Sequence, residues 1–190
     1  MPSSEVTTLR VGPVRVAWAF GADARRRVLS RLLADAGAPD DDIVHQCPHC
    51  GSAAHGRPLT SSGTTVVSIS HRGELAVAAL AHADAAAAVG VDVEADRGRE
   101  QMADLAPLFA PRPPPDVRGW TAIEAAVKAD GRGLRIAPGE VRLSDTAGDL
   151  LPGGRLIALQ GDRRIEVVGV PAPEGYVISI AIDPARESGQ

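Results

Sequence analysis

The chain has 190 residues, of which 44% are hydrophobic, 3% aromatic and 23% charged, and its formal net charge is −4. A chain of this length can bury the core of one domain or of two small fused units, and alanine, valine and leucine must fill most of that core because aromatic residues are scarce. The weak negative charge excludes bulk electrostatic binding to nucleic acid, and no run of residues approaches the ~20 apolar positions of a membrane-spanning helix.

The chain is expected to begin with a strand and a helix. Residues 11–20 alternate loosely and predict the first strand. Asp23 is the expected N-cap of a helix in which apolar residues over 28–33 recur at helical spacing. Gly37 follows as the signal that ends this helix.

Several strands are expected next. Residues 43–58 form a short, polar segment that contains glycine, both cysteines and three histidines. Residues 65–69 and 75–81 predict two strands, and residues 70–73 predict the turn between them. A small connection then leads to another strand at residues 88–94.

The remainder of the chain repeats the order of a helix followed by strands. Residues 105–110 suggest a short helix, which the proline-rich run PRPPP must break. A longer helix begins at Asp116 or Gly119 and continues to about Asp130, where the run GRG ends it. Strand-like segments separated by turns such as AGD and PGG follow at residues 140–144, 155–160, 163–170 and 176–182.

Each half of the chain therefore contains a strand, a long helix and then several strands. This order predicts an α+β fold built from two similar α+β units that lie side by side. We expect a single domain over residues 1–190, with an N-terminal half at 1–87 and a C-terminal half at 88–190.

The stretch GVDVEADR, which begins at Gly90, places two carboxylates two residues apart on a predicted strand. Because side chains alternate between the faces of a strand, the intervening valines would line one face, and Gly90, Asp92 and Glu94 would line the other. One interpretation is a half-buried strand with a solvated polar face. The other is a pair of hard oxygen ligands held a few ångströms apart on a rigid element.

The helix that follows carries a second group of polar residues. Trp120, Glu124 and Lys128 recur at a spacing of four and so share one helix face. A Glu–Lys pair at this spacing is also a common surface feature, worth only a few tenths of a kcal/mol. A tryptophan on such a face is more often part of the core than of a site.

Taken together, the strand VGVDVE and the helix WTAIEAAVKADGRGL resemble the 4′-phosphopantetheinyl transferase superfamily, most closely its surfactin-synthetase-activating type. SISH, at residues 68–71, is similar to the serine-histidine turn of that family. HGRP, at residues 55–58, is similar to its Gly-Lys/Arg-Pro element. The four motifs occur in the order of the family. The resemblance covers residues 56–134 and is weak over the first forty and last fifty residues.

The resemblance implies both a fold and an activity. The fold would consist of two α+β halves related by a pseudo-twofold axis, with coenzyme A bound between them. The enzyme would be a phosphopantetheinyl transferase of the holo-[acyl-carrier-protein] synthase type. It would move the 4′-phosphopantetheine arm from coenzyme A to a serine of an acyl or peptidyl carrier protein and release 3′,5′-ADP. The implied partners are coenzyme A and the carrier protein, without nucleic acid or membrane, and the expected state is a monomer.

Phosphoryl transfer of this kind depends on positioning and on charge stabilisation. Mg²⁺ is usually held by a few carboxylates together with substrate oxygens and water. By resemblance, Asp92, Glu94 and Glu124 would bind Mg²⁺, and Asp92 would also contact the substrate. Lys128 would be catalytic and would contact the phosphate or stabilise the leaving group. The proton of the carrier serine would go to Glu124 or to a metal-bound water.

The resemblance also assigns the nucleotide end of coenzyme A. Arg57 would bind that end, and Ser70 and His71 would bind the 3′-phosphate. A lone histidine in a turn is more often satisfied by the backbone, which is the alternative for His71. The arginines at residues 25–27 would lie near the adenine and phosphates, or would form the solvated face of the first helix.

One position departs from the family pattern. Many members have a lysine directly before the helix glutamate, where this chain has Ile123. If this position reaches the groove, a positive charge is missing, and Ile123→Lys should stimulate a slow transferase. If Ile123 instead packs between helix and sheet, a lysine there would destabilise the fold. The departure also keeps open a non-catalytic relative that binds coenzyme A or the carrier.

The cysteine segment raises a separate hypothesis. Cys47 and Cys50 are spaced as in a partial zinc site, with His45, His49 and His55 nearby. The alternatives are a zinc-stabilised interaction protein and a reduced loop that leads into HGRP. The N-terminus has no basic region followed by an apolar one, so no signal peptide is expected. Without export a disulfide framework is not expected either, and we expect a cytoplasmic protein.

Overall fold

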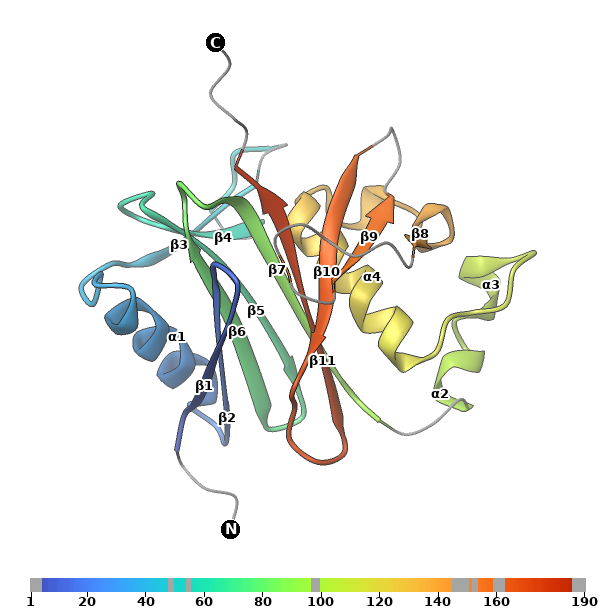
Figure 1. Cartoon of the computed structure of the whole chain (residues 1–190), viewed down its shortest axis with the longest axis horizontal. Helices are drawn as coiled ribbons and strands as arrows, with labels where there is room; N and C mark the ends of the chain where they lie inside the picture. Colours follow the sequence, from blue (N-terminus) through green and yellow to red (C-terminus); the bar gives the residue numbers. More distant parts are fainter. Residues whose placement is uncertain are drawn as a thin grey trace.

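The computed structural model describes residues 5–47, 50–53, 56–96, 100–144, 151, 154–158 and 163–185. In this part of the chain two antiparallel sheets lie next to each other, with a long helix on the outer side of each (Figure 1). The arrangement is α+β, as the sequence predicted. No helix among the described residues has the length and apolar character needed to cross a lipid bilayer.

The first sheet has six strands in the order β1-β2-β6-β5-β4-β3. All of its neighbouring strands are antiparallel. Its strands are β1 (Thr7–Val11), β2 (Val14–Phe20), β3 (Ile43–Gln46), β4 (Arg57–Thr60), β5 (Thr65–Arg72) and β6 (Leu75–His82).

The second sheet has five strands in the order β7-β11-β10-β9-β8. Its neighbouring strands are also antiparallel. Its strands are β7 (Ala86–Ala95), β8 (Arg142–Ser144), β9 (Arg155–Ala158), β10 (Arg164–Val170) and β11 (Tyr176–Pro184).

Two long helices cover the outer faces of the sheets. The helices are α1 (Ala24–Asp35), α2 (Glu100–Ala103), α3 (Ala106–Phe109) and α4 (Val117–Asp130), with short 3₁₀ turns at Gly133–Arg135 and Pro138–Glu140. Helix α1 packs on β2 and β6, and α4 packs on β7, β10 and β11. The layers therefore run from α1 through the two sheets to α4 (Figure 1).

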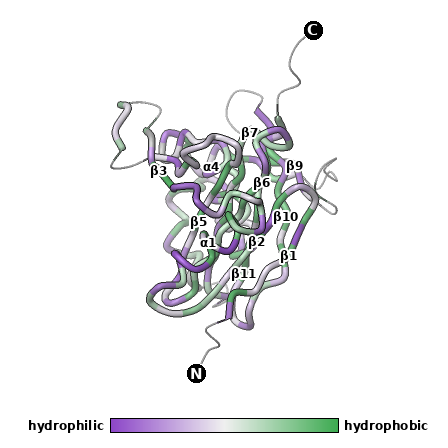
Figure 2. The backbone as a smooth tube through the Cα atoms, turned by 90° about the vertical axis from the view of Figure 1, so that its left-hand side faces the viewer, coloured by the Kyte–Doolittle hydropathy of each residue, from purple (hydrophilic) through white to green (hydrophobic). Residues whose placement is uncertain are grey.

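The main core lies between the sheets. Alternate residues of the central strands point into it, because successive side chains of a strand face opposite sides. Figure 2 views the molecule from the side of α1, and hydrophobic stretches recur along its strands. The buried members of this core on the central strands are Val14, Val16, Leu75, Val77, Ala79, Ala81, Val89, Val91, Val93, Ile178, Ile180 and Ile182.

The structure corrects several local expectations in the first half. The strand expected at residues 11–20 begins only at Val14, because Gly12 has a φ of 56° and lies in the turn that joins β1 to β2 in a hairpin. Strands β3 and β4 pair with each other inside the polar segment 43–58. Strand β5 continues to Arg72, so Ser70 and His71 lie in a strand and not in a turn. Asp23 precedes α1, but its side chain pairs with arginines instead of capping the helix.

Helix α4 begins and ends as the sequence predicted. Asp116 is its N-cap, and the side chain accepts a hydrogen bond of 2.8 Å from the backbone N–H of Gly119. Gly131 ends the helix in the left-handed conformation, with a φ of 81°. These two caps fix where α4 begins and ends.

Candidate functional site

Gly90 brings helix α4 unusually close to strand β7. A Cβ atom at this position would lie 1.9 Å from the carbonyl oxygen of Ala125 and 2.8 Å from the backbone nitrogen of Ala129. The helix backbone therefore rests directly on the strand, which only a glycine permits. Asp92 and Glu94 follow on the same face of β7, and Asp92 has only 6% of its surface exposed.

Lys128 reaches from α4 to the strands of both sheets. Its Nζ atom donates to Asp92 Oδ1 at 2.6 Å, to Ser70 Oγ at 3.0 Å and to the carbonyl oxygen of Val91 at 3.0 Å. These three acceptors use all the donors of an ammonium group. Strong charge-assisted contacts thus hold Lys128 at the junction of β5, β7 and α4.

Three side chains of β5 contact β7 at successive positions along the two strands. Ser68 Oγ accepts a hydrogen bond of 3.1 Å from the backbone N–H of Val91. Ser70 Oγ donates to Asp92 Oδ1 at 2.9 Å. Arg72 Nε lies 3.1 Å from Glu94 Oε2 as an ion pair. Alternate residues of β5 therefore face β7, and they join the first sheet to the second.

The three predicted carboxylates influence one another electrostatically. Burial raises the pKa of Glu124 above its usual value, and the negative charge of Asp92 raises it further, as does that of Glu94 to a smaller extent. Burial also raises the pKa of Glu94, which Arg72 lowers in part and Asp92 raises again. A nearby negative charge disfavours the ionised form of a carboxyl group, which is why these influences raise the pKa.

Two carboxylate oxygens at this place are buried without a hydrogen-bond partner among the described residues, namely Asp92 Oδ2 and Glu94 Oε2. The contact of Arg72 with Glu94 is an ion pair without the alignment of a hydrogen bond. Buried acceptors usually have partners, and hard carboxylate oxygens are the ligands that Mg²⁺ prefers. These residues therefore fit a magnesium ion.

Asp92 and Glu94 provide only part of the ligand set that a metal ion needs. In the described part of the chain, no three His, Cys, Asp or Glu side chains already surround a common metal position. Mg²⁺ commonly uses one or two carboxylates and takes its remaining ligands from substrate phosphates and water. Asp92 and Glu94 supply such a pair, with Glu124 on the facing helix.

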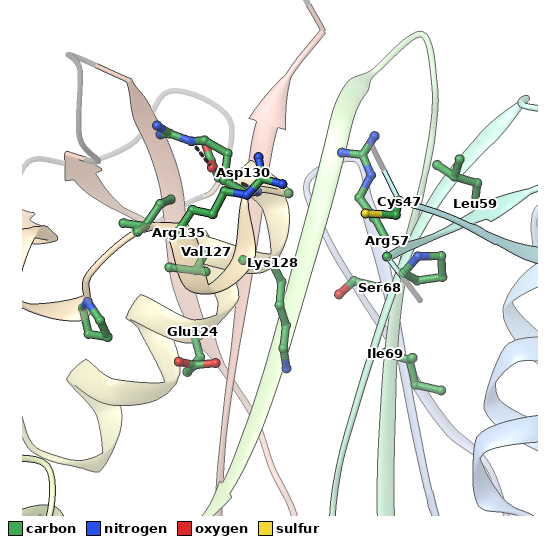
Figure 3. Close-up of a pocket in the computed structure, with 17 residues that line it drawn as sticks. Cys47, Arg57, Leu59, Ser68, Ile69, Glu124, Val127, Lys128, Asp130 and Arg135 are labelled. Carbon is green, nitrogen blue, oxygen red and sulfur yellow. Dashed lines mark hydrogen bonds and ion pairs between the residues drawn. The ribbon is translucent and has the colours of Figure 1, made fainter. Parts of the chain in front are cut away.

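A cavity of about 880 Å³ opens beside this cluster, between β4 and β5 on one side and the C-terminal part of α4 with its following turns on the other (Figure 3). Glu124 and Lys128 belong to its wall. Its apolar lining consists of Pro58, Leu59, Ile69, Val127, Ile136 and Pro138, and its cationic lining consists of Arg57, Lys128, Arg132 and Arg135. An apolar wall with four cations suits a ligand that combines a ring system with anionic groups.

Arg57 approaches the end of α4 from the opposite wall of the cavity. Its Nη1 atom lies 3.8 Å from the position that a Cβ atom would take at Gly131. Arg57 therefore faces the helix C-terminus, where the aligned peptide dipoles favour positive charge. Its assigned contact with a nucleotide stays a prediction.

The other predicted residues are arranged less simply. Asp92, Glu94 and Ser70 lie behind Lys128, and among the described residues they do not line the cavity. His71 is exposed and, by strand alternation, lies on the face of β5 opposite to Ser70. Ser70 thus joins the carboxylate cluster, and a shared contact of Ser70 and His71 with one phosphate stays a prediction.

Ile123 does not reach the groove. Only 2% of its surface is exposed, and it packs between α4 and the second sheet with residues such as Phe109, Ile157 and Ile165. Of the two explanations for this position, the structure favours core packing. The absence of a lysine there therefore does not remove a charge from the cavity wall.

Sequence reasoning missed three polar residues of the cavity: Asp130, Arg132 and Arg135. The run GRG was interpreted only as the end of a helix. The available signal was a cation placed between two glycines at a helix C-terminus, where the chain turns back on itself. The arginines at residues 25–27 of α1 are not among the residues that line the cavity. Arg26 and Arg27 form ion pairs with Asp23.

The cysteine segment borders the same cavity. Cys47 is among the lining residues, and Cys50 is exposed. The backbone N–H of Gly51 donates a hydrogen bond of 2.9 Å to the carbonyl oxygen of Cys47. His49 and His55 lie outside the described residues. Zinc binding by this segment stays an alternative to the reduced loop.

Comparison with known proteins adds no relative. No protein-family model matches the chain, and no curated protein is significantly similar to it.

Proposed function

We propose that the protein is a magnesium-dependent phosphopantetheinyl transferase, which moves the 4′-phosphopantetheine arm of coenzyme A to a serine of an acyl or peptidyl carrier protein. The observation that carries the proposal is the cluster of Asp92, Glu94, Glu124 and Lys128 beside a cavity with cationic and apolar walls. The members of this cluster come from two separate segments of the chain, the strand VGVDVE and the helix WTAIEAAVKADGRGL.

The strand orders support the two-halved fold that the proposal needs. In the first sheet, β2 is followed along the chain by α1 and four strands, in the spatial order β2-β6-β5-β4-β3. In the second, β7 is followed by helices including α4 and four strands, in the order β7-β11-β10-β9-β8. The two orders correspond strand for strand, which favours halves related by a pseudo-twofold axis, with β1 as an addition.

In the proposed reaction, the carboxylates of Asp92 and Glu94 are the residues that would hold Mg²⁺, and further ligands would come from the substrate and water. When bound, the metal would supply positive charge opposite the diphosphate of coenzyme A. Lys128 contributes an ammonium group that Asp92 and Ser70 orient, and it stabilises the charge that develops on the leaving group.

Glu124 is the proposed acceptor of the serine proton. A base works best when its pKa is close to the working pH, and burial together with Asp92 raises the pKa of this carboxyl. The arginines of the cavity, including Arg57, bind the nucleotide end, and the apolar residues on both walls exclude water from it.

Mass spectrometry of a carrier protein tests the proposal directly. A panel of acyl and peptidyl carriers is incubated with the protein, coenzyme A and Mg²⁺, and the expected result is a gain equal to the mass of the arm. Chelation of the metal should abolish the gain, and so should Asp92→Asn. A matched control is Asp35→Asn, which removes a carboxylate on α1 that pairs with Arg31.

The same experiment distinguishes an active transferase from a non-catalytic relative. That alternative predicts binding of coenzyme A in calorimetry without any gain of mass in a carrier. A normal rate of transfer by Asp92→Asn would contradict the assignment of this carboxylate to the metal site.

A further inference from the structure

Asp130, the last residue of α4, carries a fully buried carboxylate at the wall of the cavity. Its side chain is 0% exposed, and Oδ2 accepts from Arg132 Nε at 2.6 Å while Oδ1 accepts from Arg132 Nη2 at 3.2 Å. A two-point contact of this kind fixes both the position and the plane of a guanidinium group. Arg163 Nη1 also lies 3.0 Å from Asp130 Oδ1.

The turn after α4 makes this contact possible. Gly131 adopts a φ of 81°, which brings the next residue back onto the helix end, and Arg132 Nε can then reach the carboxylate two residues earlier. The side chain of Arg132 remains 37% exposed and lines the cavity. Arg57, from the first sheet, lies across the pocket from Asp130 (Figure 3), and its Nη1 atom is 3.8 Å from the position that a Cβ atom would take at Gly131.

The two arginines on Asp130 differ in their surroundings. Arg163 contacts Asp183 of β11 as well as Asp130, so it has a second carboxylate. Arg163 does not line the cavity within the described residues, whereas Arg132 does. Asp130 therefore links a structural ion-pair network to one cation that faces the ligand space.

We propose that Asp130 is a positioning residue, which holds Arg132 in the orientation that binds a phosphate group of a nucleotide in the cavity. This inference deepens the proposed function and rests on it, because a nucleotide end of coenzyme A is the ligand in question. The cavity supports this ligand class: its walls are apolar, and Arg57 and Arg132 face it from the two sheets' sides.

A positioning role and a purely electrostatic role predict opposite signs. The negative charge of Asp130 repels an anionic ligand, so its removal would strengthen binding if charge alone mattered. If Asp130 acts by orienting Arg132, removal of its carboxylate weakens binding even though the repulsion of the ligand is also removed. The direction of the change therefore separates the two roles.

Titration calorimetry with adenosine 3′,5′-bisphosphate, without carrier or metal, is the test. Arg132→Met should weaken binding by about tenfold or more, which is typical for the loss of one charge-assisted contact. Asp130→Asn should weaken it by a similar factor, and Asp130→Glu should restore part of it. In the double variant, Asp130→Asn should cause no further loss, because Asp130 acts through Arg132.

Arg163→Gln is the matched control. It removes the other arginine of the same carboxylate, so it lowers the melting temperature but leaves Arg132 bound to Asp130, and the affinity for the bisphosphate should remain unchanged. If Asp130→Asn does not fold, Arg132→Lys keeps the charge without the two-point contact, and it should weaken binding in the same way.

Unchanged or tighter binding by Asp130→Asn or Arg132→Lys would overturn the inference, as would a wild-type protein that does not bind the bisphosphate. If the wild type transfers the arm to a carrier but Asp130→Asn binds the bisphosphate as tightly as the wild type, the inference would be refuted and the proposed function would stand. If the variants change bisphosphate binding as expected but the wild type transfers nothing to a carrier, the proposed function would be refuted and the role of Asp130 in orienting Arg132 would stand.

Discussion

The two oxygens of Asp92 have different surroundings, and this difference defines the site at the scale of single residues. Oδ1 accepts from Lys128 and Ser70, whereas Oδ2 is buried without a hydrogen-bond partner in the described part of the chain. A carboxylate of this kind is neutralised on one side and available on the other. The arrangement suits a residue that orients a lysine and binds a metal ion simultaneously.

The pKa of Glu124 leads to a prediction for stability against pH. Folding raises this pKa above 4.5, so the ionised carboxylate costs free energy in the folded state at any pH above the raised value. The cost disappears as the pH falls through the raised pKa to 4.5 and below. Glu124→Gln should therefore be more stable than the wild type at pH 7, and the difference should shrink towards pH 4.

Urea unfolding at both pH values measures this difference, and Glu74→Gln, at an exposed position, serves as the control. The same Glu124→Gln variant should lose transfer activity, since the amide cannot accept the serine proton. A variant that is less stable than the wild type at pH 7 would show that the attraction between ionised Glu124 and the charge of Lys128 outweighs the cost of burying the carboxylate.

Ile123 provides a second prediction at this scale. A lysine at this buried position would place an uncompensated charge between α4 and the second sheet. We expect Ile123→Lys to lower the free energy of unfolding by about 3–5 kcal/mol, measured by urea unfolding. Ile123→Leu, which keeps the volume, should cost less than about 1.5 kcal/mol. A normally stable Ile123→Lys with faster transfer would restore the interpretation of a missing charge.

At the scale of elements, the close approach of α4 to β7 determines whether the cluster can form. Lys128 reaches Val91 and Asp92 of β7 because Gly90 lets the helix backbone lie on the strand. The helix caps complement this contact, since they set where α4 begins and ends. The position of the site therefore depends on a residue that carries no side chain.

Gly90→Ala tests this dependence. The added methyl group would overlap with backbone atoms of α4, which cannot rotate away, so the helix must move off the strand. We expect a loss of about 1–3 kcal/mol or more in stability, together with loss of transfer. Gly169→Ala on β10 is the control, because its Cβ would meet nothing closer than 3.9 Å. Equal melting temperatures for the two variants would contradict the close contact.

At the scale of the whole molecule, the two sheets share one core and cannot bury it separately. Valines and isoleucines of β7 and β11 pack against residues of β2 and β6. The side-chain contacts between β5 and β7 add a polar connection at the same interface. Separation of the halves would expose this core to water, so we expect both halves to unfold together.

The two tryptophans can report on this cooperativity, because Trp18 lies on β2 and Trp120 on α4. In Trp18→Phe and in Trp120→Phe, the urea midpoint from the fluorescence of the remaining tryptophan should equal the midpoint from circular dichroism of the same variant. Comparison within each variant removes the effect of the substitution itself. Different midpoints in either variant would show that the halves unfold independently.

The sequence by itself determined features that depend on neighbours along the chain. The alternation around Asp92, the caps of α4 at Asp116 and Gly131, and the shared helix face of Glu124 and Lys128 all follow from local periodicity. These features were enough to predict the α+β class, whereas the expectation that the carboxylates of the strand and the polar face of the helix share one site came from the family resemblance. The roles of these residues in transfer remain predictions.

Only the tertiary structure decided which faces meet across long distances in the chain. The short strands β3 and β4 obtain their partners from the sheet, and their own sequence is too polar to predict them. The contact of Ser70 with Asp92, the burial of Ile123 and the return of Arg132 onto Asp130 depend on how close two backbones approach. Packing sets that distance through side-chain volume and a single glycine, which no local pattern encodes.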